Sequence, residues 1–172
     1  MSARILLAML MLTLTGCGLR PLYSGGSGGP VATTLNRIEV APIEGKAGWL
    51  LANALNDRLA RGGNTPLYRI EVKLDDRLTA LGIRRDDTVT RERRTLRARY
   101  QLIELAKGTV LLDATAGSDV GIDSVGSDYA TIAAEASALE RLSEIVADQI
   151  TARLARFGRS AQAREATAPP PP

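Results

Sequence analysis

The chain has 172 residues, of which 45% are hydrophobic and 24% charged, with a net charge of +3. These values suit one globular domain and exclude a disordered chain. The sequence has no histidine, which excludes a Ser-His-Asp triad, a Cys-His dyad and a His-ligated metal. Its one cysteine, Cys17, excludes an internal disulfide and a thiolate zinc cluster. We therefore expect a protein that is not an enzyme and that holds no metal or cofactor.

The N-terminal end has the pattern of an export signal followed by a lipid-attachment site. Arg4 precedes the apolar run Ile5–Leu14, which is too short to cross a bilayer comfortably. Leu14–Cys17 resembles the lipobox of bacterial lipoproteins, in which the cysteine thiol receives a diacylglycerol. We expect residues 1–16 to be a signal peptide and Cys17 to carry fatty acyl chains such as palmitate. The alternative is that Cys17 is a buried structural cysteine.

Flexible segments are expected on both sides of the domain, which should span residues 34–158. Residues 17–33 contain the glycine-rich stretch Ser24–Pro30 and predict a flexible tether. The residue after the cysteine, Gly18, favours the periplasmic side of the outer membrane. Residues 159–172 end in four prolines and predict a disordered tail.

Hydrophobic periodicity predicts six elements in the order strand, helix, strand, strand, strand, helix. They cover residues 37–43, 47–61, 67–83, 89–105, 109–120 and 128–157. Pro42 places the first strand at a sheet edge, and Gly158 is expected to end the last helix. Asp76 falls on the apolar face of its strand and indicates a bulge or bend there. Ser127 or Asp128 should cap the last helix.

Alternation along the three long strands separates an apolar face from a polar face. The strand side chains expected in the core are Tyr68, Ile70, Val72, Leu74, Leu78, Ala80, Leu96, Ala98, Tyr100, Leu102, Val110, Leu112, Ala114 and Ala116. The expected core of the first helix is Leu51, Leu55 and Leu59, with Trp49 in the core or at the helix edge. The last helix should bury Ile132, Ala136, Leu139, Val146, Ile150, Leu154 and Phe157.

These patterns predict an α+β fold, with two helices packed on one face of a four-stranded, mostly antiparallel sheet in the order β-α-β-β-β-α. The other face of the sheet is left uncovered by the chain's own helices. That face concerns function, because it should carry an unusual number of arginines.

Seven arginines lie between residues 84 and 99, at positions 84, 85, 91, 93, 94, 97 and 99, against three acids. Strand geometry places Arg91, Arg93, Arg97 and Arg99 together on the uncovered face. Guanidinium groups match phosphate and carboxylate oxygens, so the cluster predicts an anion site. The alternative is a solvated face in an arginine-rich chain. The export signal and the 3% aromatic content argue against nucleic acid as the partner.

The pattern as a whole resembles the LptE family of lipopolysaccharide-assembly lipoproteins, in its alphaproteobacterial form. The stretches that carry the resemblance are Gly16–Tyr23, Ile38–Pro42 with Gly45, the leucines and Asn53 of the first helix, Tyr68–Leu74, Gly82–Ile83, Arg91, Ala98–Leu102, Asp128–Ala130 and Ala134–Glu135. The similarity runs from Cys17 to about Phe157.

The resemblance implies two helices on a four-stranded sheet and a non-catalytic role. It implies that the protein plugs, and helps to assemble, a large outer-membrane β-barrel that inserts lipopolysaccharide. It also implies contact with lipopolysaccharide, for which Arg91 and Arg93 match best by position. Some relatives carry a lysine near the start of the last helix, but Tyr129–Ser137 contains no basic residue. The alternative function is that of a stand-alone periplasmic lipoprotein that binds lipid or assists its transport.

Overall fold

The computed structural model of the chain describes residues 29–59, 65–83, 89–123 and 127–167. The predicted signal peptide, the Cys17 anchor, most of the tether, Arg84, Arg85 and the prolines at the end of the tail lie outside these ranges.

The described residues form a four-stranded mixed sheet with helices on one side. The elements are α2 (Pro30–Leu35), β1 (Ile38–Val40), α3 (Gly45–Leu59), β2 (Tyr68–Ile83), β3 (Val89–Glu104), β4 (Thr109–Asp123) and α4 (Asp128–Thr167). The strand order is β1-β2-β3-β4, in which β1 is parallel to β2 and the other pairs are antiparallel. The predicted fold class and element order are therefore confirmed, with α2 as an additional short helix.

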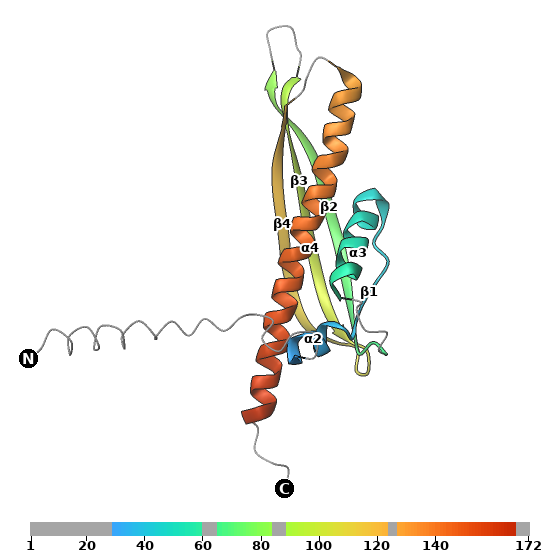
Figure 1. Cartoon of the computed structure of the whole chain (residues 1–172), viewed down its shortest axis with the longest axis vertical. Helices are drawn as coiled ribbons and strands as arrows, with labels where there is room; N and C mark the ends of the chain where they lie inside the picture. The colour runs from blue at the N-terminus through green and yellow to red at the C-terminus, as the bar shows by residue number, and fades with distance from the viewer. Residues whose placement is uncertain (1–28, 60–64, 84–88, 124–126, 168–172) are drawn as a thin grey trace, which may run out of the picture.

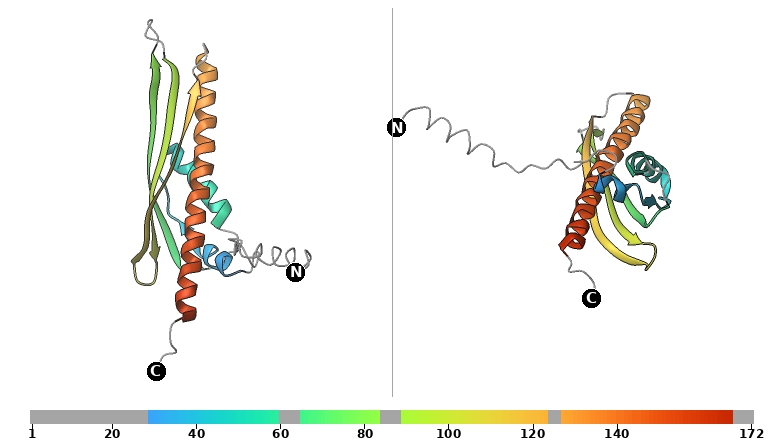
Figure 2. Two further views of the ribbon diagram at one scale, coloured as in Figure 1. Left: turned by 90° about the vertical axis from the view of Figure 1, so that its left-hand side faces the viewer. Right: turned by 60° about the horizontal axis from the view of Figure 1, so that its bottom comes forward.

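The core lies between the sheet and the two long helices, α3 and α4, which cover the same face (Figures 1 and 2). Leu51 and Leu55 of α3 and Ile150 of α4 are fully buried, as are Ile70 of β2 and Leu96 of β3. The alternating strands and the leucine stripes meet in one apolar layer, as the sequence predicted. Helix α2 closes the lower end with Val31 and Leu35, so the last residues of the predicted tether belong to the folded domain.

Two element ends differ from the prediction. Strand β1 is shorter than predicted because Pro42 has no N–H to donate, and the last main-chain bond from this segment is Ala41 N–H to Ile70 O at 3.0 Å. Helix α4 passes through Gly158 and ends at Thr167. Gly158 is buried against α2, where an added Cβ would lie 3.2 Å from Thr34 Cγ2. Its small size permits close helix packing and does not end the helix, so the helix occupies the beginning of the predicted tail.

Asp76 does not mark a bulge. The pairing register runs through Asp76 opposite Leu96 without a break, and the irregularity of this hairpin lies between Ala80 and Ile83. Asp76 instead forms a fork with Arg94 of β3, with Nε–Oδ1 and Nη2–Oδ2 distances of 2.9 and 2.6 Å. Arg94 Nη1 also donates to the main-chain oxygen of Glu135 on α4 at 3.1 Å. Both polar side chains are thus satisfied on the apolar face, and together they tie the hairpin to α4.

Four positions predicted in the core are exposed, namely Leu78, Ala80, Val110 and Ile132. Trp49, predicted in the core or at the helix edge, is exposed as well. The register of β3 and β4 shifts between Leu102 and Ile103, so Val110 pairs with Ile103 and is 47% exposed. A one-residue slip moves a side chain to the other face of a sheet. Ile132 and Trp49 are 65% and 63% exposed because the sheet does not cover the first turns of α4, nor this side of α3.

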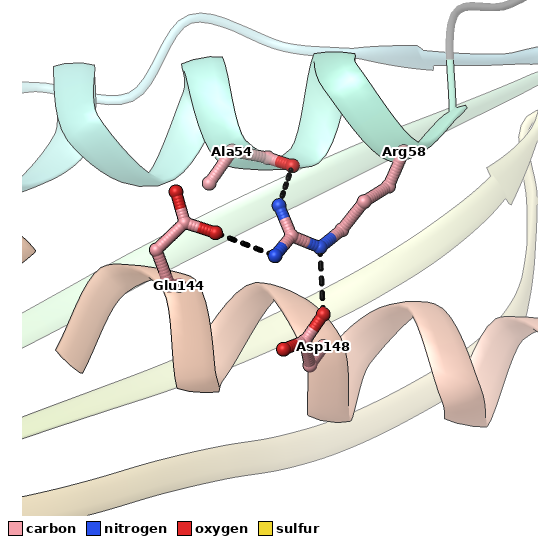
Figure 3. A network of polar contacts seen from close by, with 4 residues as sticks. All are labelled: Ala54, Arg58, Glu144 and Asp148. Atoms are coloured by element: carbon pink, nitrogen blue, oxygen red, sulfur yellow. Dashed lines mark hydrogen bonds and ion pairs between the residues drawn. The ribbon is translucent and has the colours of Figure 1, made fainter. Parts of the chain in front are cut away.

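An arginine joins the two long helices at the surface (Figure 3). Arg58 of α3 donates from Nη2 to Glu144 at 2.5 Å and from Nε to Asp148 at 2.8 Å, both on α4. Its Nη1 donates to the Ala54 main-chain oxygen at 2.6 Å.

On the far side of α4, the Gln149 side chain exchanges two hydrogen bonds with the main chain of Gly117. Helix α4 therefore contacts α3 and also protects part of the free edge of β4.

Candidate functional site: the arginine face

The face of the sheet opposite the helices carries the predicted arginine array. Arg91, Arg93, Arg97 and Arg99 alternate along β3 and all are exposed. Strand β3 lies between β2 and β4, so the four guanidinium groups occupy the middle of the open face. We call this surface the arginine face and define it by these four residues. The predicted shared orientation is present in the structure.

A row of aspartates on β4, which was not among the predicted site residues, faces the same arginines. Arg91 Nε lies 3.3 Å from Asp123 Oδ1, and Arg93 Nε lies 3.6 Å from Asp119 Oδ2. Arg99 donates from Nε and Nη2 to Asp113 at 3.2 and 3.0 Å. The even spacing of these aspartates was the signal that could have revealed them, because it places them on one face of β4.

These ion pairs moderate the charge of the face but leave its arginine side chains accessible to solvent. Arg91, Arg93, Asp119 and Asp123 are each more than half exposed. Exposed ion pairs contribute little free energy and exchange readily with other ions. Glycines of β4 also bring the arginine side chains close to the strand, since an added Cβ at Gly121 would lie 3.5 Å from two Arg91 nitrogens.

Arg97 differs from its neighbours because it forms no ion pair with the described carboxylates. Asp75 lies directly across from it on β2 but pairs with Arg77 instead, at 2.9 Å. The Arg97 stem lies over Gly117, where an added Cβ would be 3.1 Å from Arg97 Cγ. The guanidinium of Arg97 is therefore the most available donor of the arginine face.

A depression of about 440 Å³ opens on the same face where β1 turns away from β2 at Pro42. Lys73 and Arg99 line it from neighbouring strands and lie directly opposite each other in the register. Lys73 has no carboxylate partner in the described part of the chain, although Glu71 also lines the depression. The lining is mixed, since the apolar Ala41, Pro42 and Val72 lie beside these charged side chains.

The electrostatics of Asp113 show which arginine is least available. The Arg99 hydrogen bonds, together with one from Gln101 at 2.8 Å, lower the pKa of the Asp113 carboxyl below its ordinary value. The same contact with Asp113 raises the pKa of Arg99. An anion that binds Arg99 must therefore displace the two hydrogen bonds to Asp113. An anion that binds Arg97 displaces no ion pair with a described carboxylate.

No group of three or more acidic or cysteine side chains in the described ranges could hold a metal ion. None of the helices in the described ranges is long and apolar enough to cross a membrane.

Taken together, these features define a two-layer α+β module with a charged, open sheet face. Comparison with known proteins makes the assignment more specific. The model of the LptE family, described as lipopolysaccharide-assembly, matches residues 35–154. The chain therefore belongs to the LptE family, a family of non-catalytic lipopolysaccharide-assembly lipoproteins.

Solved structures agree with this assignment. A Caulobacter crescentus CB15 protein described as a lipoprotein shares 27% identity and a TM-score of 0.66, covering 77% of this chain and 98% of its own. A minor lipoprotein from Acinetobacter baumannii has 16% identity and a TM-score of 0.56, covering 70% and 91% of the two chains. Lipoprotein B from Nitrosomonas europaea has 12% identity and a TM-score of 0.55, covering 74% and 87%. The last two show the fold alone. A search of curated protein sequences gives no significant match.

Proposed function

We propose that this chain is the lipid-anchored plug of the outer-membrane β-barrel that inserts lipopolysaccharide, and that it helps this barrel to assemble. In this proposal Cys17 carries the acyl chains and holds the domain on the periplasmic side of the outer membrane. The observation that supports it most is membership of the LptE family over residues 35–154. A barrel would also enclose a domain whose own helices leave one charged sheet face open to a ligand.

The arginine face is the surface we assign to lipopolysaccharide. Arg91, Arg93, Arg97 and Arg99 would bind its phosphate or carboxylate groups through bidentate hydrogen bonds. Arg97 should contribute most because no described carboxylate pairs with it, and Arg99 should contribute least because Asp113 holds it at two points.

Two variants test this assignment. Arg97→Gln should weaken lipopolysaccharide binding at low salt by about fivefold to tenfold, because a charge-assisted contact to a carboxylate or phosphate is lost. The charge reversal Arg91→Asp with Arg93→Asp should weaken it further. The matched control is Arg153→Gln, an exposed arginine on α4 in the other layer. Unchanged binding by the arginine-face variants, or an equal loss in the control, would refute the assignment.

Co-purification tests the partner. Isolation of this protein from membranes in mild detergent should bring down a large β-barrel, and mass spectrometry should find Cys17 acylated. Isolation as a lone monomer with an unmodified thiol would contradict the proposal. That result would favour the alternative, a stand-alone lipid-binding lipoprotein.

A further inference from the structure

We propose a second interaction surface, on the helix side of the sheet, that binds a segment of the barrel partner in which a lysine or arginine is flanked by apolar side chains. The surface lies at the upper end of the molecule in Figure 1, between the hairpin of β2 and β3 and the first turns of α4. We call it the wedge site and define it by Leu78, Glu92, Tyr129 and Ile132. The inference rests on the proposed barrel partner, but it concerns protein contact and not lipopolysaccharide.

The apolar stripe of α4 continues beyond the part that the sheet covers. Ile132 lies seven residues before Leu139, which is within about 20° of the same helix face. Leu139 is 1% exposed, whereas Ile132 is 65% exposed and Tyr129, one turn earlier, is 85% exposed. The position of this part of α4 is fixed by the bond from Arg94 to the Glu135 main chain. Ile132 and Tyr129 thus extend the core-facing stripe but are left largely uncovered by the described residues.

The sheet opposite α4 shows the same incomplete cover. Leu78 shares the helix-side face of β2 with Leu74, which packs against the core. Leu78 is nevertheless 43% exposed. Two apolar surfaces that belong to the same interior layer therefore remain open at one end of it. Neighbouring exposed apolar surfaces with a polar group beside them are typical of protein-interaction sites.

Glu92 supplies that polar group. It lies on the helix-side face of β3, opposite Ala80 on β2 and Ile122 on β4. Its Oε2 is buried and has no hydrogen-bond partner in the described structure. Buried polar atoms are nearly always hydrogen-bonded in complete assemblies. The missing partner is therefore expected to be a donor that arrives with the occupant of the wedge site.

The charges around Glu92 favour a cationic occupant. The one described arginine on this part of the face, Arg94, is already held by Asp76 and by the Glu135 main chain. Asp128 and Glu135 of α4 add negative charge at the same end. A phosphorylated lipid would be repelled here, whereas a lysine or arginine would form a charge-assisted hydrogen bond with the carboxylate. Charge complementarity thus favours a basic protein segment over lipopolysaccharide.

Site-specific photo-crosslinking in intact membranes tests this inference. A photoreactive residue at position 132 should capture the barrel, through a peptide that contains lysine or arginine beside apolar residues. The matched control is position 49, where Trp49 is 63% exposed on α3 and should give at most background capture. Glu92→Lys should reduce capture at position 132 by about tenfold or more, because it places like charges in the contact. Glu92→Gln should reduce it less, and the exposed acid change Glu140→Lys on α4 should leave it unchanged.

Thermal unfolding of each variant separates lost contact from lost folding, and Glu92→Gln is the variant expected to fold normally. Capture of lipopolysaccharide at position 132, capture insensitive to Glu92→Lys, or capture no stronger than at position 49 would each overturn the wedge site. If the barrel still co-purifies in those cases, the proposed function stands and only this inference fails. If no barrel co-purifies with the unmodified protein, both fail.

Discussion

The fork between Arg94 and Asp76 allows a quantitative prediction for Asp76→Asn. The substitution keeps the side-chain volume but removes the charge that balances Arg94, whose side chain is only 16% exposed. The fork has contact distances of 2.9 and 2.6 Å, and hydrogen bonds to charged groups contribute about 1.5–3 kcal/mol. Asp76 is 25% exposed, so water compensates part of the loss. We therefore expect a loss of about 2 kcal/mol in the free energy of unfolding, or about 8 °C in Tm for a domain of this size.

Urea unfolding and thermal melting followed by circular dichroism measure this loss. The neighbouring change Asp75→Asn is the matched control, because Asp75 pairs with Arg77 on the solvent face and its loss should hardly change stability. The double variant Asp76→Leu with Arg94→Met should recover most of the stability, because it removes both charges from the apolar face. Equal effects of Asp75→Asn and Asp76→Asn would refute the reasoning, since burial would then make no difference.

Three further variants test other contacts. Gly48→Ala should lower stability by about 1–3 kcal/mol in urea unfolding, because its Cβ would lie 2.6 Å from the Ile43 main-chain oxygen, whereas Gly121→Ala, with 3.5 Å of clearance, should have little effect. Burial raises the pKa of the Tyr100 phenol, so the native state disfavours ionisation, and the wild type should lose stability as pH rises above about 10. Tyr100→Phe should not show this loss of stability at alkaline pH. Identical alkaline melting curves for the wild type and Tyr100→Phe would contradict the prediction. The pKa of Asp113 is lowered, so its stabilising contribution should be present above its unfolded pKa near 3.8 and disappear as pH falls through the folded value. Asp113→Asn should therefore differ from the wild type at neutral pH and converge with it in acid; a difference that persists in acid would contradict the linkage.

Much of the fold could be predicted from the sequence because the governing interactions are local. Period-two alternation defines the faces of β2, β3 and β4, and the repeat of leucines defines α3. Edge placement of β1 follows from Pro42, which lacks the N–H that a central strand needs. The common face of Arg91, Arg93, Arg97 and Arg99 follows from the same alternation and needs no knowledge of neighbouring strands.

The pairing of those arginines could not be predicted in this way. Which arginine meets Asp113, Asp119 or Asp123 depends on the register between β3 and β4, and this register changes by one residue near Leu102. The same shift turned Val110 outward. The sequence shows how charges alternate along each strand, but contact between strands is a non-local property.

The local sequence alone determined the α+β class, the order of the elements and the composition of each face, since these depend on the repeat of side chains along single segments. Only the tertiary structure decided that Gly158 permits helix packing and that Asp76 holds Arg94. The tertiary structure alone also decided that Arg97 forms no ion pair with a carboxylate of the described ranges. Each of those outcomes depends on the distance between segments far apart in the chain. Such distances are set by packing of the whole domain, which no segment encodes by itself.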